Sequence, residues 1–339
     1  MQTFVATKEE LIPQNAARKI FSLIKSEMAL VEVEFERQAS SNVQVINYLG
    51  DYLRQSGGKR VRPALLILAA YAVGGKGSSD NSIRLATVME MLHTATLVHD
   101  DIIDNADLRR SRASVNAKFG NQAAVLMGDW LYMSAFETSL KERSLEILDI
   151  LTRVTRKMTE GELIQLTMIG NTAITRDEYF DILRRKTAYL FSGCAEIGAI
   201  IGGADHNAQI ALRDYGMNLG IAFQLADDLL DFTADERVLG KAAGADLVEG
   251  KITLPLILLQ ESQPEVRKLL ERVMYDGVYD SDTRDSISTK LTEYGTLDAI
   301  REIARSFALA ARKNLDILRE TEYRSALDEI PNFVIDRKS

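Results

Sequence analysis

The sequence predicts an all-α protein, and three observations support this prediction. Apolar residues recur at spacings of three and four over long stretches, and no segment alternates convincingly between apolar and polar residues. Only 5 prolines occur in 339 residues, so few positions break a helix. The breaks between the periodic stretches are short and rich in glycine, unlike long flexible linkers. We therefore expect one helical-bundle domain over residues 1–339, with peripheral termini at 1–15 and 325–339.

The expected helices follow one another along the whole chain. The first, over residues 16–35, carries an apolar stripe that includes Ile20 and Val31. Thr175 with Glu178 and Ser262 with Glu265 have the spacing of a capping box at a helix start. The other expected helices are residues 85–104, 123–140, 145–166, 178–202, 210–232, 254–260 and 300–318.

The composition excludes several classes of protein. The chain has 49 acidic and 41 basic residues and a net charge of −8, whereas a nucleic-acid-binding protein is normally basic. One cysteine and three histidines are too few for a disulfide framework, a cysteine metal site or a histidine-rich metal centre. No secretory signal is recognisable, and the longest apolar run, residues 64–75, is shorter than the roughly 20 residues that cross a bilayer. We expect a cytoplasmic protein without an integral membrane segment.

Two aspartate motifs of the same pattern lie near the ends of apolar helices. Aspartates four positions apart share one helix face, and carboxylates among apolar residues are costly to bury unpaired. Oxygen ligands without cysteine or many histidines favour a hard cation such as Mg²⁺. Two solvated acidic helix ends are the alternative interpretation. The carboxylates are Asp100, Asp101 and Asp104 in the first motif, and Asp227, Asp228 and Asp231 in the second, where Gln224 precedes by one turn.

Basic residues gather in short segments of this acidic chain. Residues 57–63 place three cations after a diglycine, and residues 105–112 place three more directly after the first motif. Such segments are often solvated surface, but next to metal-binding carboxylates they indicate a diphosphate site, because arginine suits phosphate geometry. His93 shares a helix face with Asp100, and we expect it to contact a ligand, whereas His99 fits a hydrogen-bonded core position.

In their order along almost the whole chain, these segments resemble the trans-isoprenyl diphosphate synthases, also called the polyprenyl synthetase family. The similarity is greatest to the bacterial long-chain octaprenyl and nonaprenyl diphosphate synthases. It implies the isoprenoid synthase fold, a helical bundle around a deep central cavity with the two aspartate motifs facing each other at its mouth. The matching motifs are G-G-K-R-V-R-P at 57–63, H-D-D-I-I-D at 99–104, R-R-S-R at 109–112, G-D-W-L at 128–131, R-R-K-T at 184–187, F-Q-L-A-D-D-L-L-D at 223–231 and E-G-K-I-T-L-P at 249–255.

The resemblance also implies an activity and its residues. The enzyme would ionise an allylic diphosphate such as farnesyl diphosphate, condense it head-to-tail with isopentenyl diphosphate and release a proton. Mg²⁺ would bind the six aspartates named above. The implied catalytic residues are Asp100, Asp104, Asp227, Lys186 and Lys241. The implied substrate-binding residues are Arg109, Thr187 and Gln224 for the allylic diphosphate, Lys59, Arg62, His93 and Arg110 for isopentenyl diphosphate, and Lys251 as a further candidate.

The length of the product is expected to depend on the residues below the first motif. Ala95 and Thr96 lie about one turn before Asp100, and both are small. Small residues there predict a long all-trans product such as octaprenyl diphosphate, for a quinone side chain. A shorter-chain farnesyl or geranylgeranyl diphosphate synthase is the alternative. Ile147 and Leu151 are candidates for the cavity floor.

Other functions fit the sequence less well, and two kinds of partner are expected. A terpene cyclase or a head-to-head condensing synthase would use related chemistry. A cyclase is expected to carry an Asn/Ser/Glu second motif, which Asp227–Asp231 does not match. A phosphohydrolase needs more histidines, and a non-catalytic regulatory subunit is expected to have lost aspartates or arginines. The family resemblance further implies a homodimer, and a long product implies peripheral membrane contact during its release.

Overall fold

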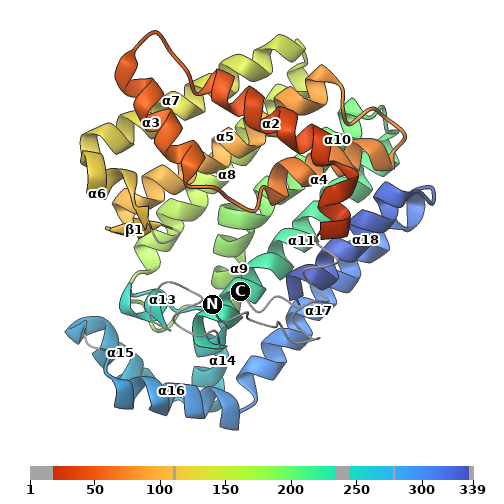
Figure 1. Cartoon of the computed structure of the whole chain (residues 1–339). Coiled ribbons are helices and arrows are strands. Elements are labelled where there is room, and N and C mark those ends of the chain that lie inside the picture. The colour runs from red at the N-terminus through yellow and green to blue at the C-terminus, as the bar shows by residue number, and fades with distance from the viewer. Residues whose placement is uncertain (1–17, 110–111, 234–243, 278, 336–339) are drawn as a thin grey trace, which may run out of the picture. The chain divides into compact units, whose positions relative to one another are not determined.

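A computed structural model describes residues 18–109, 112–233, 244–277 and 279–335, and nearly all of these lie in helices (Figure 1). The prediction of an all-α fold is confirmed. The chain divides into two compact units. Unit 1 consists of Met1–Thr155, Leu190–Gly216 and Asn314–Ile330, and unit 2 of Arg156–Tyr189, Met217–Lys313 and Pro331–Ser339.

The described elements are distributed over both units. Unit 1 contains α2 (Lys25–Gln38), α3 (Gln44–Gln55), α4 (Val61–Ala72), α5 (Asp80–Ile103), β1 (Leu108–Arg109), β2 (Arg112–Ala113), α6 (Val115–Phe119), α7 (Asn121–Ser139), η1 (Leu140–Glu142) and η3 (Leu315–Ile317). Unit 2 contains α9 (Arg176–Leu183), η2 (Arg184–Ala188), α13 (Ala245–Val248), α14 (Leu254–Ser262), α15 (Val266–Asp276) and α16 (Ser281–Glu293). Helices α8 (Leu145–Met168), α10 (Tyr189–Ile201), α11 (His206–Thr233), α17 (Thr296–Asn314) and α18 (Glu322–Ile335) have residues in both.

The core of unit 1 forms around α4 and α5. The continuous apolar run of α4 is buried on all sides, with Leu65 and Leu68 at 0% exposure. Helix α5 packs against α2, α4 and α7, and α5 and α7 lie side by side in Figure 1. Gly128 of α7 makes this contact close, because a Cβ atom there would lie 2.2 Å from Nε2 of His99. The last turns of α5, which carry the first aspartate motif, are therefore fixed against α7.

The core of unit 2 forms around α14. Every side chain from Leu254 to Leu259 is buried, and α14 contacts α9, α15 and α16. Leu225 and Leu229 of α11 belong to the same apolar cluster. The part of α11 that carries the second aspartate motif is thus anchored on its apolar side.

The region from 178 to 202 differs from the single helix that we expected. It consists of α9, a π-helical segment η2 and α10. Hydrophobic spacing does not reveal a π-helical turn, which often occurs at functional sites. Gly161 of α8 accommodates it, because a Cβ atom there would lie 2.7 Å from Cβ of Arg185.

One of the two predicted capping boxes is confirmed. Thr175 Oγ1 accepts a hydrogen bond from the Glu178 amide at 3.3 Å, and the Glu178 carboxylate accepts one from the Thr175 amide at 2.8 Å. The prediction of a capping box at Ser262 is wrong. Its hydroxyl donates to the Leu258 carbonyl oxygen as the last residue of α14, and Glu265 is the N-cap of α15.

Other differences come from short or interrupted elements. The expected helix over 16–35 is interrupted at Ile24, and the helix expected over 300–318 ends as the 3₁₀ turn η3. The antiparallel pair β1–β2 was not expected, since strands of two residues carry no alternating pattern. Residues 1–15 lie outside the described residues. The segment expected to be a peripheral C-terminus begins inside α18, where Leu327 is fully buried and its carbonyl accepts a hydrogen bond from the Tyr215 hydroxyl.

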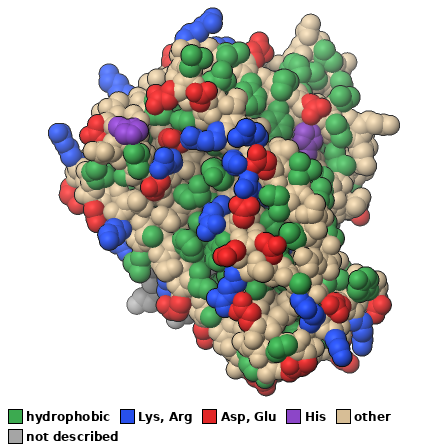
Figure 2. Space-filling view, turned by 180° about the vertical axis from the view of Figure 1, so that it is seen from behind, with side chains coloured by type: hydrophobic (Ala, Val, Ile, Leu, Met, Phe, Trp, Pro, Cys, Tyr) green, Lys and Arg blue, Asp and Glu red, His purple; other side chains and the backbone are tan. Residues whose placement is uncertain are grey.

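The surface carries charges of both signs. Figure 2 shows a face on which Lys and Arg side chains lie among Asp and Glu side chains. In the described part of the chain, no helix has the length and apolar character needed to cross a bilayer.

Candidate active site

The first aspartate motif lies at the C-terminal end of α5 in unit 1. Asp101 is 2% exposed, while Asp100 and Asp104 are half-buried. Arg109 Nε donates to Asp101 Oδ1 at 2.6 Å. Burial raises the pKa of Asp101, and the charge and hydrogen bond of Arg109 act in the opposite direction. The motif therefore points one carboxylate inward to an arginine and leaves two partly accessible.

The turn after α5 is built by the β1–β2 pair, which presents the second basic segment. Asn116 Nδ2 donates to the Asp101 carbonyl oxygen at 3.1 Å, which ties α6 to the end of α5. The Tyr52 hydroxyl donates to the Ala113 carbonyl oxygen at 2.6 Å, and the Arg112 guanidinium lies 4.7 Å from the Tyr52 ring centroid. Arg110, a predicted substrate-binding residue, lies outside the described residues.

The first basic segment lies at the start of α4. Lys59 is exposed, and Arg62 is half-buried with its guanidinium 4.8 Å from the Phe191 ring centroid. A cavity of about 40 Å³ in unit 1 is lined by Gly57 and Arg60 of this segment together with Asp101 and Arg109. The structure thus brings Asp101 and Arg109 to one cavity with Gly57 and Arg60 of the first basic segment, whereas the predicted substrate-binding residues Lys59 and Arg62 do not line it.

The other predicted residues of α5 have different surroundings. His93 is half-buried, and Thr96 donates its hydroxyl to the His93 carbonyl oxygen at 2.7 Å. Ala95 is fully buried. His99 Nε2 lies 3.1 Å from the Val125 carbonyl oxygen and its ring stacks on Tyr132, so the expected hydrogen-bonding contact is present, but the side chain is half-buried and not in the core.

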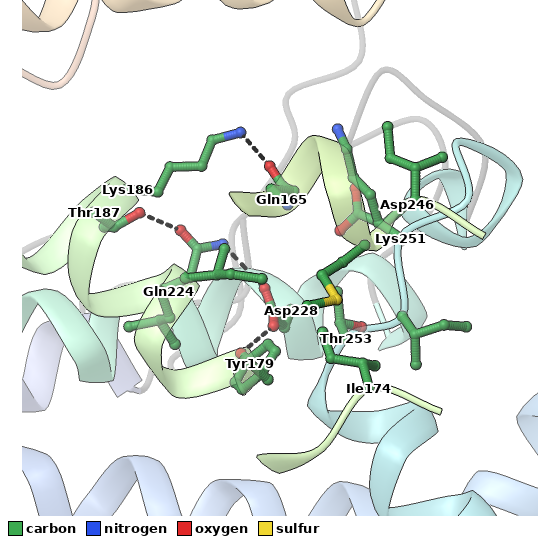
Figure 3. Close-up of a pocket in the computed structure, with 15 residues that line it drawn as sticks. Gln165, Ile174, Tyr179, Lys186, Thr187, Gln224, Asp228, Asp246, Lys251 and Thr253 are labelled. Carbon is green, nitrogen blue, oxygen red and sulfur yellow. Dashed lines mark hydrogen bonds between the residues drawn. The ribbon is translucent and has the colours of Figure 1, made fainter. Parts of the chain in front are cut away.

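The second motif lies beside a cavity of about 160 Å³ in unit 2 (Figure 3). Five of the predicted residues line this cavity, and they come from η2, α11 and the segment before α14. Of the other two aspartates of the motif, Asp231 is 2% exposed and Asp227 is half-buried. The predicted residues in the cavity wall are Lys186, Thr187, Gln224, Asp228 and Lys251.

A chain of hydrogen bonds fixes Asp228 in this wall. The Thr187 hydroxyl donates to Gln224 Oε1 at 2.9 Å, and Gln224 Nε2 donates to Asp228 Oδ1 at 3.0 Å (Figure 3). The Tyr179 hydroxyl donates to the other carboxylate oxygen. Burial and the nearby negative charge of Asp246 raise the pKa of Asp228 to about 7.

The two lysines of the cavity are held by carboxylates and an amide. Lys186 Nζ lies 2.7 Å from Glu162 Oε2 and donates to Gln165 Oε1 at 2.6 Å. Lys251 Nζ lies 2.7 Å from Glu249 Oε2. Lys241, a predicted catalytic residue, lies outside the described residues.

The sequence did not single out Asp246 and Tyr179, two titratable neighbours of Asp228 in this cavity. The Gly244 amide donates to the Asp231 carbonyl oxygen at 2.9 Å. The residues that follow Gly244 place Asp246 in the same cavity wall as Asp228. Its position inside the lysine-containing loop was the available signal, but it does not share the aspartate pattern. Tyr179 carried no signal, because a single tyrosine near a helix start is more often core.

The carboxylate oxygens of each unit fit a hard cation whose coordination shell is completed by oxygen atoms of a ligand. Within the described residues, no group of three or more acidic, histidine or cysteine side chains is placed to hold a metal ion. Asp100, Asp104 and Asp227 are half-buried, and Asp101 and Asp228 accept hydrogen bonds from Arg109 and Gln224. Magnesium typically takes one or two carboxylates plus phosphate oxygens and waters rather than a full protein cage. These residues therefore fit magnesium bound together with a diphosphate.

Comparisons with known proteins show the family of the chain. The family model described as "Polyprenyl synthetase" matches residues 43–290. The octaprenyl diphosphate synthase of Escherichia coli is 38% identical over 320 residues, which are 94% of this chain and 98% of that protein. The geranylgeranyl diphosphate synthase of Methanosarcina mazei is 37% identical over 85% of this chain and 88% of its own.

A solved structure is similar over nearly the whole fold. The polyprenyl synthase of Caulobacter crescentus, solved with calcium and isoprenyl diphosphate, has a TM-score of 0.90 and 36% identity. The match covers 95% of this chain and 98% of that one. The chain therefore belongs to the polyprenyl synthetase family of prenyltransferases.

Proposed function

We propose that this chain is a Mg²⁺-dependent synthase that adds isopentenyl diphosphate head-to-tail to an allylic diphosphate. The product is a long all-trans polyprenyl diphosphate such as octaprenyl diphosphate, for a quinone side chain. The observation that carries the proposal is that each unit joins its aspartate motif to cationic side chains at one cavity. A diphosphate and a hard cation together satisfy both kinds of group.

The residues of the site are suited to stabilise a leaving diphosphate. Magnesium, when bound, would supply Lewis-acid stabilisation of the charge that develops on the leaving group. Asp100 and Asp104 in unit 1, and Asp227 in unit 2, would hold magnesium ions. Arg109, Lys186 and Thr187 would bind the allylic diphosphate with the help of Gln224, Lys241 and Lys251. Preorganised cations of this kind stabilise the developing negative charge without further rearrangement.

The second substrate is assigned to the first basic segment. Lys59 and Arg62 with His93 and Arg110 would hold the diphosphate of isopentenyl diphosphate, so that its double bond attacks the allylic carbocation. The departing diphosphate then accepts the proton that is released. No protein nucleophile is needed, and exclusion of water from the site protects the carbocation.

The direct test is a synthase assay. Purified protein is mixed with Mg²⁺, radiolabelled isopentenyl diphosphate and farnesyl diphosphate, and the products are separated by chromatography. We expect an octaprenyl-length product that disappears with EDTA. A geranylgeranyl-length product supports the shorter-chain alternative, a cyclic hydrocarbon supports a cyclase, and the absence of product overturns the proposal.

The long product rests on the small residues below Asp100. Relatives named for octaprenyl and geranylgeranyl products have nearly equal identity to this chain, 38% and 37%, so identity alone does not decide product length. Ala95 is fully buried, and on the proposed path of the growing chain a tyrosine ring at this position would be an obstacle. Ala95→Tyr is therefore expected to shorten the product, and an unchanged product length would contradict the depth argument.

We further propose that the protein acts as a cytoplasmic homodimer and contacts a membrane only peripherally, to release its apolar product. The apolar residues Leu126, Met133 and Leu140 are spaced by seven and are 68, 63 and 52% exposed along α7 and η1. Such a stripe is typical of a helix that packs on a second copy. We expect Met133→Glu to lower the molecular mass measured by light scattering to that of a monomer, whereas Leu309→Glu on α17, whose wild-type side chain is 62% exposed, leaves it unchanged.

A further inference from the structure

We propose that Arg60 and Glu90 are positioning residues that hold the first basic loop in the conformation in which Lys59 and Arg62 bind isopentenyl diphosphate. The inference rests on the proposed function, because it concerns the same substrate. Neither Arg60 nor Glu90 belongs to the residues assigned to substrate or metal above.

The backbone of this loop needs an external restraint. Gly57, Gly58 and Arg60 have φ angles of 67°, 155° and 49°. Glycine adopts positive φ readily, but arginine in the left-handed region is strained and persists only when its surroundings fix it. Arg60 is also the N-cap of α4. Its backbone conformation therefore sets how Lys59, before it, and Arg62, in the first turn of α4, are oriented.

The Arg60 side chain supplies the restraint. Its Nε and Nη2 donate to the two carboxylate oxygens of Glu32 at 2.6 and 3.2 Å, and its Nη1 donates to Glu90 Oε1 at 2.7 Å. The Arg60 side chain is 12% exposed, and its guanidinium lies 5.6 Å from the Phe35 ring centroid. The guanidinium is therefore held by one carboxylate from α2 and one from α5, which leaves it little freedom to bind a substrate.

The burial of Glu90 makes this restraint depend on the charge of Arg60. The side chain of Glu90 is 5% exposed, so loss of Arg60 would leave a buried charge without this cation. Glu90 and Asp101 line the same cavity from one face of α5, and each forms an ion pair with an arginine of a basic segment. One helix face thus fixes both cationic segments, Arg60 in the loop and Arg109 in β1.

The charges of the first basic loop also support a positioning role for Arg60. Lys59, Arg60 and Arg62 lie within four residues, and like charges so close repel one another. Glu32 and Glu90 compensate the charge of Arg60, which lowers the repulsion that it exerts on Lys59 and Arg62. The competing interpretation is that Arg60 itself contacts the diphosphate.

The test compares KM for isopentenyl diphosphate with KM for farnesyl diphosphate and with kcat. Arg60→Met and Glu90→Gln are each expected to raise the first KM by about 10-fold or more, because small displacements of binding groups are costly. The second KM and kcat are expected to change by less than about threefold. The double variant should resemble the single ones, since both remove one interaction.

Two further variants separate the possible causes. Arg60→Gly relieves the backbone strain but removes the ion pairs, so it must also raise the KM if the restraint matters. Arg84→Met is the matched control, because it removes another part-buried arginine–carboxylate pair of α5, that of Arg84 with Glu142. The control should lower thermal stability by a similar amount and leave the KM unchanged.

Several outcomes would overturn the inference. If Glu90→Gln leaves the KM unchanged while Arg60→Met raises it, Arg60 binds the substrate directly. If Arg84→Met raises the KM equally, the effect is one of general stability. Should the Arg60 variants fail to fold, Glu32→Gln, whose wild-type side chain is 41% exposed, is expected to give a smaller increase of the same KM, and no increase counts against the inference.

Failure of the proposed function is distinguishable from failure of this inference. An inactive wild-type protein contradicts the proposed function. In that case calorimetric titration with inorganic diphosphate still compares wild-type protein with Glu90→Gln, and equal affinities would refute the positioning role. Active wild-type protein with unchanged Arg60 and Glu90 variants refutes the inference alone.

Discussion

The two aspartate motifs have the same pattern but hold their second aspartate by different means. In unit 1 the buried Asp101 accepts a hydrogen bond from the cation Arg109. In unit 2 the equally buried Asp228 accepts hydrogen bonds from the neutral groups of Tyr179 and Gln224. In both motifs the first aspartate, Asp100 or Asp227, remains half-buried.

The difference shows that a repeated motif does not repeat its electrostatics. Arg109 compensates the charge of Asp101 within the protein. Among the described residues, the hydrogen-bond donors to Asp228 are neutral, and burial together with the nearby charge of Asp246 raises its pKa to about 7. A bound cation would therefore relieve more repulsion in unit 2 than in unit 1.

The largest expected effect concerns the half-buried first aspartate that the two motifs have in common. Asp100→Ala and Asp227→Ala should each lower kcat by at least about 100-fold, because each removes an accessible carboxylate assigned to the metal. Steady-state kinetics at saturating Mg²⁺ and substrates measures this loss. Asp149→Ala, an exposed aspartate of α8, is the control. Near-normal turnover in either motif variant would show that only the other motif serves catalysis.

The next effect concerns the ionisation of Asp228 in magnesium-free protein with EDTA. Its folded pKa of about 7 lies above its unfolded value of about 3.9, so this stability contribution is complete below about pH 4 and is lost as the pH rises to about 7. Asp228→Asn should therefore gain stability relative to wild type over this window, by an amount on the order of 2–4 kcal/mol. Urea unfolding at several pH values measures it.

Asp101→Asn supplies the comparison for this pH series. The pKa of Asp101 is also raised by burial, but Arg109 opposes the shift, so we expect a smaller pH-dependent gain. Equal pH dependence in the two variants would mean that the cationic and neutral partners hold their aspartates alike.

Much of the fold and of the two motifs could be predicted from the sequence. Helix periodicity identified α5 and α11, and the spacing of their aspartates identified the carboxylates at their ends. Glycines and arginines of the first basic loop were visible in the sequence, because a diglycine before several cations is a local pattern.

What the sequence did not reveal depends on which side chains meet in the fold, and most of these contacts join distant segments. The distinction between Asp101 and Asp228 arises from Arg109, which is 8 residues from Asp101, and from Tyr179, which is 49 residues from Asp228. The ion pair of Arg60 with Glu90 joins residues 30 positions apart. The π-helical turn that presents Lys186 is also hidden, since one additional residue in a turn leaves the apolar pattern nearly unchanged.

The smallest expected effects separate the partners of the two buried aspartates. Arg109→Gln should lower the free energy of unfolding at pH 8 by about 2 kcal/mol, because it leaves the buried charge of Asp101 without its cation. Tyr179→Phe should lower it by only about 1 kcal/mol, the usual cost of one hydrogen bond, and Gln224 still donates to Asp228. Chemical denaturation in EDTA measures both. At pH 5 protonation relieves Asp228, so the cost of Tyr179→Phe should shrink further, whereas that of Arg109→Gln should shrink less. A larger loss for Tyr179→Phe than for Arg109→Gln at pH 8 would reverse the comparison and make the phenol, rather than the arginine, the stronger support of its motif.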